Sequence, residues 1–241
     1  MPSLAWRGTV GVVKPTYESG SLVEFIRLLP EGIGVIPLYL GIKEYTREAF
    51  LEALDTYHLR VAELAEKGVD VIHPEGAPPF LLRGYAAERE IVKGWEERYK
   101  IPIFTSAMSQ TAAFRALGIK RFLGVTFLGG DVTRLFGRYF VEAGFDVAAM
   151  ETIAIDREQR YAISAEEIYA RIKSLYLRHA DVDGIYLLGS GTWRVTDIVP
   201  LEEDLGIPIV HPVAARVWYV QKVLRVRQPV RGAGRLLESM P

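Results

Sequence analysis

The stretch GVDVIHPEGAPPF, residues 68–80, decides the fold of this chain. Its first five residues form a short run rich in β-branched side chains, and prolines and a glycine follow almost at once. A short run of this kind that ends in turn-forming residues is typical of a buried strand of a parallel sheet. We therefore predict a strand over 69–73 that ends in a loop over 73–84.

Seven other short runs have the same character and alternate with longer amphipathic segments. The strands are predicted over 9–14, 34–39, 101–105, 121–127, 145–153, 183–188 and 207–211, and the helices over 46–67, 131–143, 165–179 and 213–225. Alternation of this kind predicts an α/β fold with parallel sheets.

Two helices carry more detailed signals. In the first, the predicted core stripe is Leu51, Leu54, His58, Val61 and Ala65, with Gly68 as the C-cap. Ser164 and Glu167 form the pattern of a capping box at the start of another.

A weak internal repeat divides the chain into two halves. GVDVI followed by YKIPIFTSA (99–107) is echoed by VDGIYLL (182–188) followed by LGIPIVHPVAA (205–215). The predicted division is 1–113 plus 213–241 for the first half and 114–212 for the second. Ligands of parallel sheets bind beyond the carboxyl ends of the strands, so we expect the site in a cleft between the halves. The loops that would line it are 14–20, 73–84, 127–133, 189–196 and 211–215.

Composition restricts the class of partner. The 241 residues include 29 basic and 30 acidic side chains, a net charge of -1, which does not predict binding to nucleic acid or to anionic membranes. We find no secretory signal and no apolar run of the ~18 residues that a membrane span needs. We expect a cytoplasmic protein whose partner is a small molecule, and a symmetric homo-oligomer is compatible with this.

Two residue types are missing altogether. The chain has no cysteine, which excludes disulfides, thiolate nucleophiles and cysteine-metal sites. It also has no asparagine. Loss of both is typical of selection against heat-labile side chains, so we predict a thermophilic source.

The segment LLGSGTWR, residues 187–194, has the strongest features of a binding loop. Gly189 and Gly191 let the backbone approach a ligand, while Ser190, Thr192 and neighbouring N–H groups can hold a carboxylate or an enolate oxygen. An ordinary strand-to-helix turn with hydroxyl N-caps explains the same residues. Trp193 beside them is either a pocket wall or helix packing.

The loop HPEGAPPFLLRG offers charged groups. Glu75 is a candidate acid or base, Gly76 permits close approach, and Arg83 is a candidate carboxylate clamp. Lys14 and Arg194 are further candidate clamps, and Pro15 and Thr16 belong to the same predicted site.

Of the four histidines, only His211 is predicted to line the cleft. His73 and His58 are interpreted as structural and His179 as a partner of a helix C-terminus. No metal-ligand spacing, phosphate loop or dinucleotide fingerprint is present, so neither a metal nor a cofactor is predicted.

The same loops resemble the aspartate/glutamate racemase superfamily, in its arylmalonate decarboxylase and maleate cis-trans isomerase branch. The resemblance rests on five segments: 68–76, FLLRG (80–84), IPIFTSAMSQTAAFRALGIKR (101–121), DGIYLLGSGTWRVTDIVPLEEDLGIPIV (183–210) and AARVW (214–218). It implies two pseudo-symmetric flavodoxin-like halves with parallel sheets and an inter-domain cleft that holds the site.

The resemblance also implies one cysteine per half, and this chain has neither. The first cysteine position matches Gly76. The second matches Ser190 when residues are counted back from Pro200, and Gly189 when they are counted forward from Gly184. Arylmalonate decarboxylases carry glycine at the first position and keep the second cysteine as proton donor.

The pocket positions of that enzyme differ here as well. Ala77 and Pro78 replace hydroxyl residues, and Phe127 lies where a tyrosine is expected, while Gly191 and Thr192 keep their backbone N–H donors.

Three functions remain open on this basis. The first is a cofactor-independent decarboxylase or isomerase of a small carboxylate that works through an enolate-like intermediate, with Glu75, Ser190 and His211 as acid/base candidates. The second is a hydrolase in which Ser190 acts with His211 as base. The third is a carboxylate-binding protein without turnover, which the apolar Ala77, Pro78 and Phe127 favour modestly.

Overall fold

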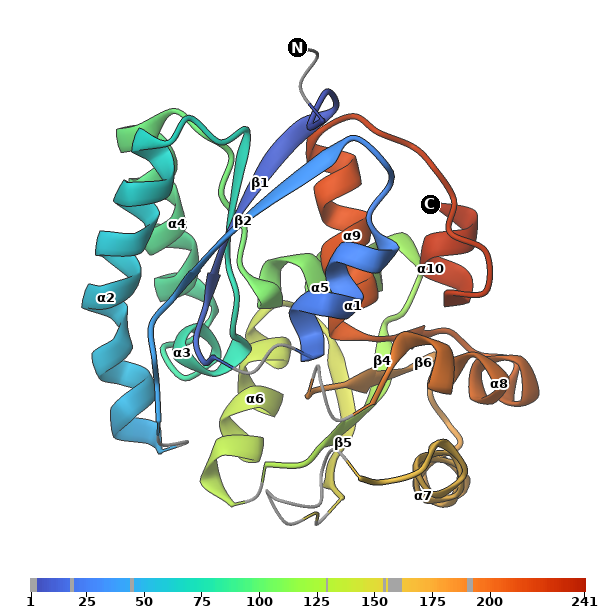
Figure 1. The fold of residues 1–241 in the computed structure, drawn as a ribbon. Helices are drawn as coiled ribbons and strands as arrows, with labels where there is room; N and C mark the ends of the chain where they lie inside the picture. Colours follow the sequence, from blue (N-terminus) through green and yellow to red (C-terminus); the bar gives the residue numbers. More distant parts are fainter. Residues whose placement is uncertain are drawn as a thin grey trace.

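The computed structural model describes residues 4–17, 20–43, 46–128, 130–153, 155, 162–189 and 193–241. It contains two parallel sheets, one in each half of the fold (Figure 1). The first has the order β2 (Ile33–Tyr39), β1 (Gly8–Lys14), β3 (Val71–Pro74). The second has the order β5 (Asp146–Thr152), β4 (Arg121–Thr126), β6 (Gly184–Leu187), β7 (Ile209–Val210). The helices are α1 (Gly20–Leu28), α2 (Arg47–Glu66), α3 (Ala77–Leu81), α4 (Tyr85–Tyr99), α5 (Ser106–Ala116), α6 (Asp131–Glu142), α7 (Ala165–Arg178), α8 (Val195–Leu205), α9 (Pro212–Val223) and α10 (Gly234–Ser239).

The two sheets share one topology, which confirms the predicted repeat and fold class. In each, the first strand is central, the second lies on one side and the third on the other, as in flavodoxin-like folds. The echoed segments YKIPIFTSA and LGIPIVHPVAA lie beside the third strand of their respective sheets, where Ile103 bridges Ile72 and β7 pairs with β6.

The predicted strand over 101–105 is wrong, and the one over 207–211 is shortened to two residues. Only Ile103 pairs in the first sheet. Pro102 has no N–H to donate, and Thr105 is already the N-cap of α5, where its side chain accepts from the Met108 amide. The strand predicted over 207–211 ends at Val210, because His211 is already the N-cap of α9.

Helices cover both faces of the first sheet. α2, α3 and α4 lie on one side and α1, α5 and α9 on the other (Figure 1). α9, from the C-terminal segment that was assigned to the first half, packs on α1 and α5. The predicted boundary at 113/114, however, falls within α5. The exact division of the halves therefore stays a prediction.

An aromatic core continues from one half into the other. Phe114 on α5 contacts the rings of Phe122, Phe140 and Tyr186, which come from β4, α6 and β6. The Tyr186 hydroxyl donates to Gln110 Oε1 at 3.1 Å. A separate apolar cluster covers the opposite face of the second sheet beneath α7 and α8. α5 thus packs against elements of both halves.

The core face of α2 is shifted by one residue from the predicted stripe. The buried residues are Phe50, Ala53, Tyr57, Val61 and Leu64, whereas His58 is exposed. Two aromatic rings, Phe50 and Tyr57, direct this rotation because they bury more area than Leu51 and Leu54. The helix is one residue shorter at each end than the predicted 46–67, with Thr46 as its N-cap. Its C-cap is Lys67 and not the predicted Gly68, which follows with φ +69°. None of the helices in the described part of the chain has the length and hydrophobicity needed to cross a bilayer.

Candidate active site

The turn after β3 is closely packed against the loop after β1, α2 and α5. Gly76 has φ +106°, and its amide donates to Ser106 Oγ at 3.2 Å. A Cβ atom here would lie 2.9 Å from the Tyr57 hydroxyl and 3.3 Å from Pro15 Cγ. Tyr57 also donates to the carbonyl of Glu75. The position that the family resemblance matched to a cysteine therefore has no room for a side chain in this conformation.

The Glu75 carboxylate, immediately before this turn, lies in a buried ionic cluster. Lys14 Nζ lies 3.3 Å from both carboxylate oxygens, and Ser21 Oγ donates to Oε1 at 2.9 Å. Arg216 Nη1 lies 2.8 Å from the same oxygen. The four residues come from β1, α1, the β3 loop and α9, and Lys14, Glu75 and Arg216 are almost completely buried.

These neighbours keep Glu75 ionised. Burial alone raises the pKa of the carboxyl group, but Arg216 and Lys14 outweigh it, with smaller contributions from His73 and Ser21, and lower the pKa to about 2. A carboxylate with this pKa is a weak base and carries no proton to donate near neutral pH. The geometry therefore gives Glu75 an electrostatic role and does not support the predicted acid/base role.

His211 is also fully engaged. Its Nδ1 accepts from the Val213 amide at 3.1 Å, and Nε2 lies 3.0 Å from the Trp193 carbonyl oxygen. Since a carbonyl only accepts, Nε2 carries the proton and the ring has no free lone pair. Burial lowers its pKa to about 4. This geometry assigns His211 to helix capping rather than to proton transfer.

His73 lies next to the cluster on the same face of the sheet. Its Nδ1 is 2.9 Å from the Phe104 carbonyl, its ring stacks on that phenyl ring, and burial lowers its pKa to about 3. The structural interpretation of His73 is consistent with these contacts.

The loops of the second half contribute Phe127 and Gly189. The Phe127 ring packs over Gly189, which has φ +122°, and edge-on against Trp193. Trp193 is completely buried, so it packs in the core of this half. Ser190, Gly191 and Thr192 lie outside the described residues.

Two of the predicted carboxylate clamps point elsewhere. Arg83 Nη2 donates to the Leu51 carbonyl at 2.6 Å, and Arg83 lines a cavity of about 390 Å³ between the α3–α4 turn and α6. Arg194 is exposed and forms a two-point ion pair with Asp197 at the start of α8. Neither joins the cluster around Glu75.

The two halves meet close to this cluster. Glu24 on α1 accepts from the Val195 amide at 2.7 Å, which places α1 against the first residue of α8. Arg216 acts electrostatically on Glu24, Glu75 and His211. The carboxyl end of the first sheet is therefore connected to the segment that follows β6, as the family resemblance implied.

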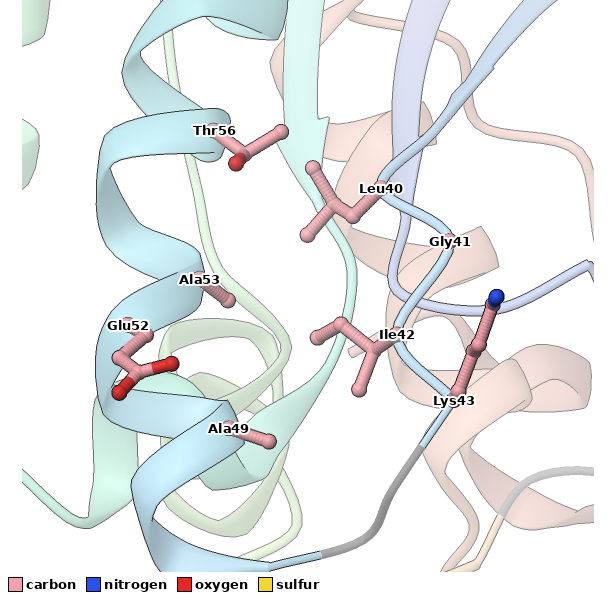
Figure 2. A pocket seen from close by; sticks show the side chains of 8 residues that line it. All are labelled: Leu40, Gly41, Ile42, Lys43, Ala49, Glu52, Ala53 and Thr56. Atoms are coloured by element: carbon pink, nitrogen blue, oxygen red, sulfur yellow. The ribbon is translucent and has the colours of Figure 1, made fainter.

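An open groove with a volume of about 310 Å³ lies beside the site, between the end of β2 and α2. Leu40 and Ile42 point toward α2, whereas the Lys43 side chain points away from it (Figure 2). The amides of Leu40 and Ile42 donate to the carbonyls of Lys14 and Pro15 at 2.9 and 2.8 Å. The groove is thus attached to the loop after β1, in which Pro15 and Thr16 are half-buried.

The sequence-based prediction missed Arg216, Ser21 and Glu24. Arg216 had a usable signal: it is the one charge within PVAARVWYV, and a charged residue on an apolar helix is rarely buried without a partner. Ser21 and Glu24 had none, since both lie on a short helix whose orientation depends on α9. Within the described part of the chain, no group of three acidic or histidine side chains could hold a metal ion.

The chain is similar to known proteins over almost its full length. A family model described as arylmalonate decarboxylase matches residues 10–237. The arylmalonate decarboxylase of Bordetella bronchiseptica is 22% identical over 233 residues, which cover 96% of this chain and 97% of that protein. The maleate isomerase Iso from Pseudomonas putida S16 superposes with a TM-score of 0.88 at 23% identity, over 97% of this chain and 99% of the other. The maleate cis-trans isomerase of Nocardia farcinica, bound to Tris, gives 0.87 at 19%, over 96% and 98%.

Proposed function

The chain belongs to the arylmalonate decarboxylase family, and we propose that it is a cofactor-independent enzyme that acts on a small carboxylate through an enolate-like intermediate, without a thiol. The observation that carries this proposal is the pair of buried cations, Lys14 and Arg216, beside Gly76. They supply positive charge at the carboxyl end of the first sheet, where this fold binds its ligands.

Among the reactions of this family, decarboxylation fits the residues best. Loss of carbon dioxide needs no base, because the electrons of the breaking C–C bond pass into the enolate system as the carboxylate leaves as neutral CO₂. A single proton then adds to the carbon atom. Racemisation or thiol-assisted isomerisation requires a second acid/base group or a nucleophile, and the chain has no cysteine.

The proton donor is then Ser190 or a water molecule that it holds. Glu75 has no proton to give, and His211 has both ring nitrogens engaged. Loops 76–78 and 190–192 hold the intermediate in this proposal. The Gly76 amide already donates to Ser106 and Pro78 has no N–H, so the amides of Ala77 and of residues 190–192 stabilise the negative oxygen atoms.

Among the described residues, no contact of His211 favours hydrolysis. A serine nucleophile needs an adjacent base with a free lone pair, and His211 directs its Nε2–H to the Trp193 carbonyl.

Proton NMR in D₂O tests the proposal with maleate, methyl(phenyl)malonate, aspartate and a hydantoin. We expect monocarboxylate product from the malonate, with one deuterium at the α-carbon. Fumarate formed from maleate would assign isomerisation instead, and hydantoin opening would assign hydrolysis. If no compound reacts while one of them raises the melting temperature, the protein is a carboxylate-binding protein and the proposed catalysis is wrong.

A further inference from the structure

Arg216 has one edge of its guanidinium group unused. The side chain is about 1% exposed, and Nη1 forms the ion pair with Glu75. Within the described residues, Nε and Nη2 donate to no acceptor, although both atoms are buried. A buried N–H group without an acceptor is costly, and more so on a charged group, so such groups call for an explanation.

The unused atoms have a specific geometry. Nε–H and Nη2–H lie on the same edge of the planar group and point in parallel, while Nη1 lies on the far side of the Cζ atom. This edge is the one with which arginine binds both oxygens of a carboxylate side-on. The ion pair with Glu75 fixes the plane, and the Phe25 ring, 5.4 Å from Cζ, packs against it.

The charges around this edge favour an anion. Lys14 and Arg216 share the single ionised carboxylate of Glu75. Glu24 on α1 lies outside this cluster, and one of its oxygens accepts from the Val195 amide. His73 is neutral, because burial lowers its pKa to about 3. The cluster therefore holds more positive than negative charge in a buried place, where an uncompensated charge is costly.

We propose that the Nε–Nη2 edge of Arg216 binds one carboxylate group of the substrate side-on, which makes Arg216 a substrate-binding residue of this site. The binding of a carboxylate by Arg216 does not depend on the proposed function, but which carboxylate of the substrate it binds rests on the proposed decarboxylation. A carboxylate that stays ion-paired to a guanidinium group keeps its charge, whereas the carboxylate that leaves as CO₂ loses it. Arg216 therefore binds the group that is retained, and a second carboxylate is the one that reacts.

Isothermal titration calorimetry with malonate and maleate tests this assignment, with malonamide as the uncharged counterpart of malonate. Arg216→Lys keeps the charge and loses the two-point edge, while Arg216→Met loses both. We expect malonate affinity to fall at least tenfold in the first variant and below detection in the second, and malonamide to bind to none. Arg115→Lys is the control. Arg115 lies on α5, and its guanidinium donates to the Ala143 carbonyl at the end of α6.

The inference is overturned if both Arg216 variants are folded by circular dichroism and bind malonate as tightly as the original protein, or if the original protein binds neither dianion. If the Arg216 variants fail to fold, Glu75→Gln provides the test. It leaves Arg216 in place and removes the competing carboxylate, so malonate should bind more tightly; unchanged or weaker binding would contradict the proposal.

The same samples, followed by NMR, separate this inference from the proposed function. Binding that depends on Arg216 without any product supports the site and contradicts the enzyme. Product formation with the same kcat and KM in Arg216→Lys supports the enzyme and contradicts the site.

Discussion

The Arg216 guanidinium lies 2.8 Å from the Glu75 carboxylate and joins α9, near the end of the chain, to the loop that follows β3. Both side chains are almost completely buried, and Lys14 and Ser21 complete the same cluster. This contact links two segments that are far apart in the sequence, and the following predictions begin from it.

Replacing Glu75 by Gln should lower the free energy of unfolding by about 3–5 kcal/mol, because it leaves two buried cations without their carboxylate. Urea denaturation measures this change. Glu63→Gln is the control: Glu63 pairs with Arg60 at the surface, and loss of such a pair costs about 1 kcal/mol or less. Since the pKa of Glu75 is lowered in the folded protein, its contribution is complete above about pH 4.5 and disappears as the pH falls toward about 2. Equal losses in both variants at pH 7 would contradict the prediction.

The free energy of unfolding should decrease as the pH falls, because the buried histidines bind protons only in the unfolded chain. His73 and His211 have pKa values lowered to about 3 and about 4, against an ordinary value of about 6.5, so the unfolded chain binds more protons than the folded one in this range. His211→Asn keeps an N-cap acceptor for α9 but cannot titrate. Between about pH 6 and pH 4, its unfolding free energy should change less steeply with pH, by up to about 1.4 kcal/mol per pH unit. Identical slopes would show that His211 is not held neutral.

The contact between Gly189 and Phe127 should forbid any side chain at position 189. In Gly189→Ala the new Cβ would lie 2.2 Å from Phe127 Cε1, in addition to the strain of φ +122°. Gly118→Ala is the matched control, because Gly118 also has positive φ, +74°, and no atom lies near its added Cβ. We expect a loss of about 1 kcal/mol in the control and about 1–3 kcal/mol more at position 189. Phe127→Ala in the same chain should recover the difference; no recovery would place the clash elsewhere.

Ser190→Ala should lower the rate of the reaction identified by NMR by on the order of a hundredfold, as expected for loss of a proton-transfer group. Ser239→Ala is the control, since its hydroxyl donates to the Arg235 carbonyl on α10. A rate for Ser190→Ala that equals the control would remove Ser190 from the mechanism and leave water as the donor.

The protein should unfold well above the range of about 45–65 °C that is typical of mesophilic domains. The basis of this prediction is the absence of cysteine and asparagine, which is typical of proteins from thermophilic sources. Differential scanning calorimetry gives the midpoint, and a value within that range would contradict a thermophilic source.

The strands were predicted from the sequence more accurately than the packing of the helices and the contacts of the site. The strands at 9–14, 34–39 and 121–127 were predicted to within one residue, because burial on both faces of a parallel sheet requires a continuous apolar run. The core face of α2 was predicted one residue out of place, because the sizes of Phe50 and Tyr57, and not the period alone, decide which side packs.

Among the site residues, Lys14, Glu75 and Gly76 were found from the sequence because Lys14 ends a predicted strand and the other two follow one. The roles of Arg83, Arg194 and His211 could not be predicted from the sequence. Each already has a partner within the protein, such as the Leu51 carbonyl for Arg83 and Asp197 for Arg194, and only the folded chain shows these contacts.

The sequence by itself determined the alternation of strands and helices, the repeat and the absence of a thiol, because these depend on local period and on composition. The tertiary structure alone decided that Arg216 meets Glu75 and that His211 has no free lone pair. Such contacts join segments far apart in the chain, and their strength depends on burial, which raises the cost of an unpaired charge and exists only once both halves have packed.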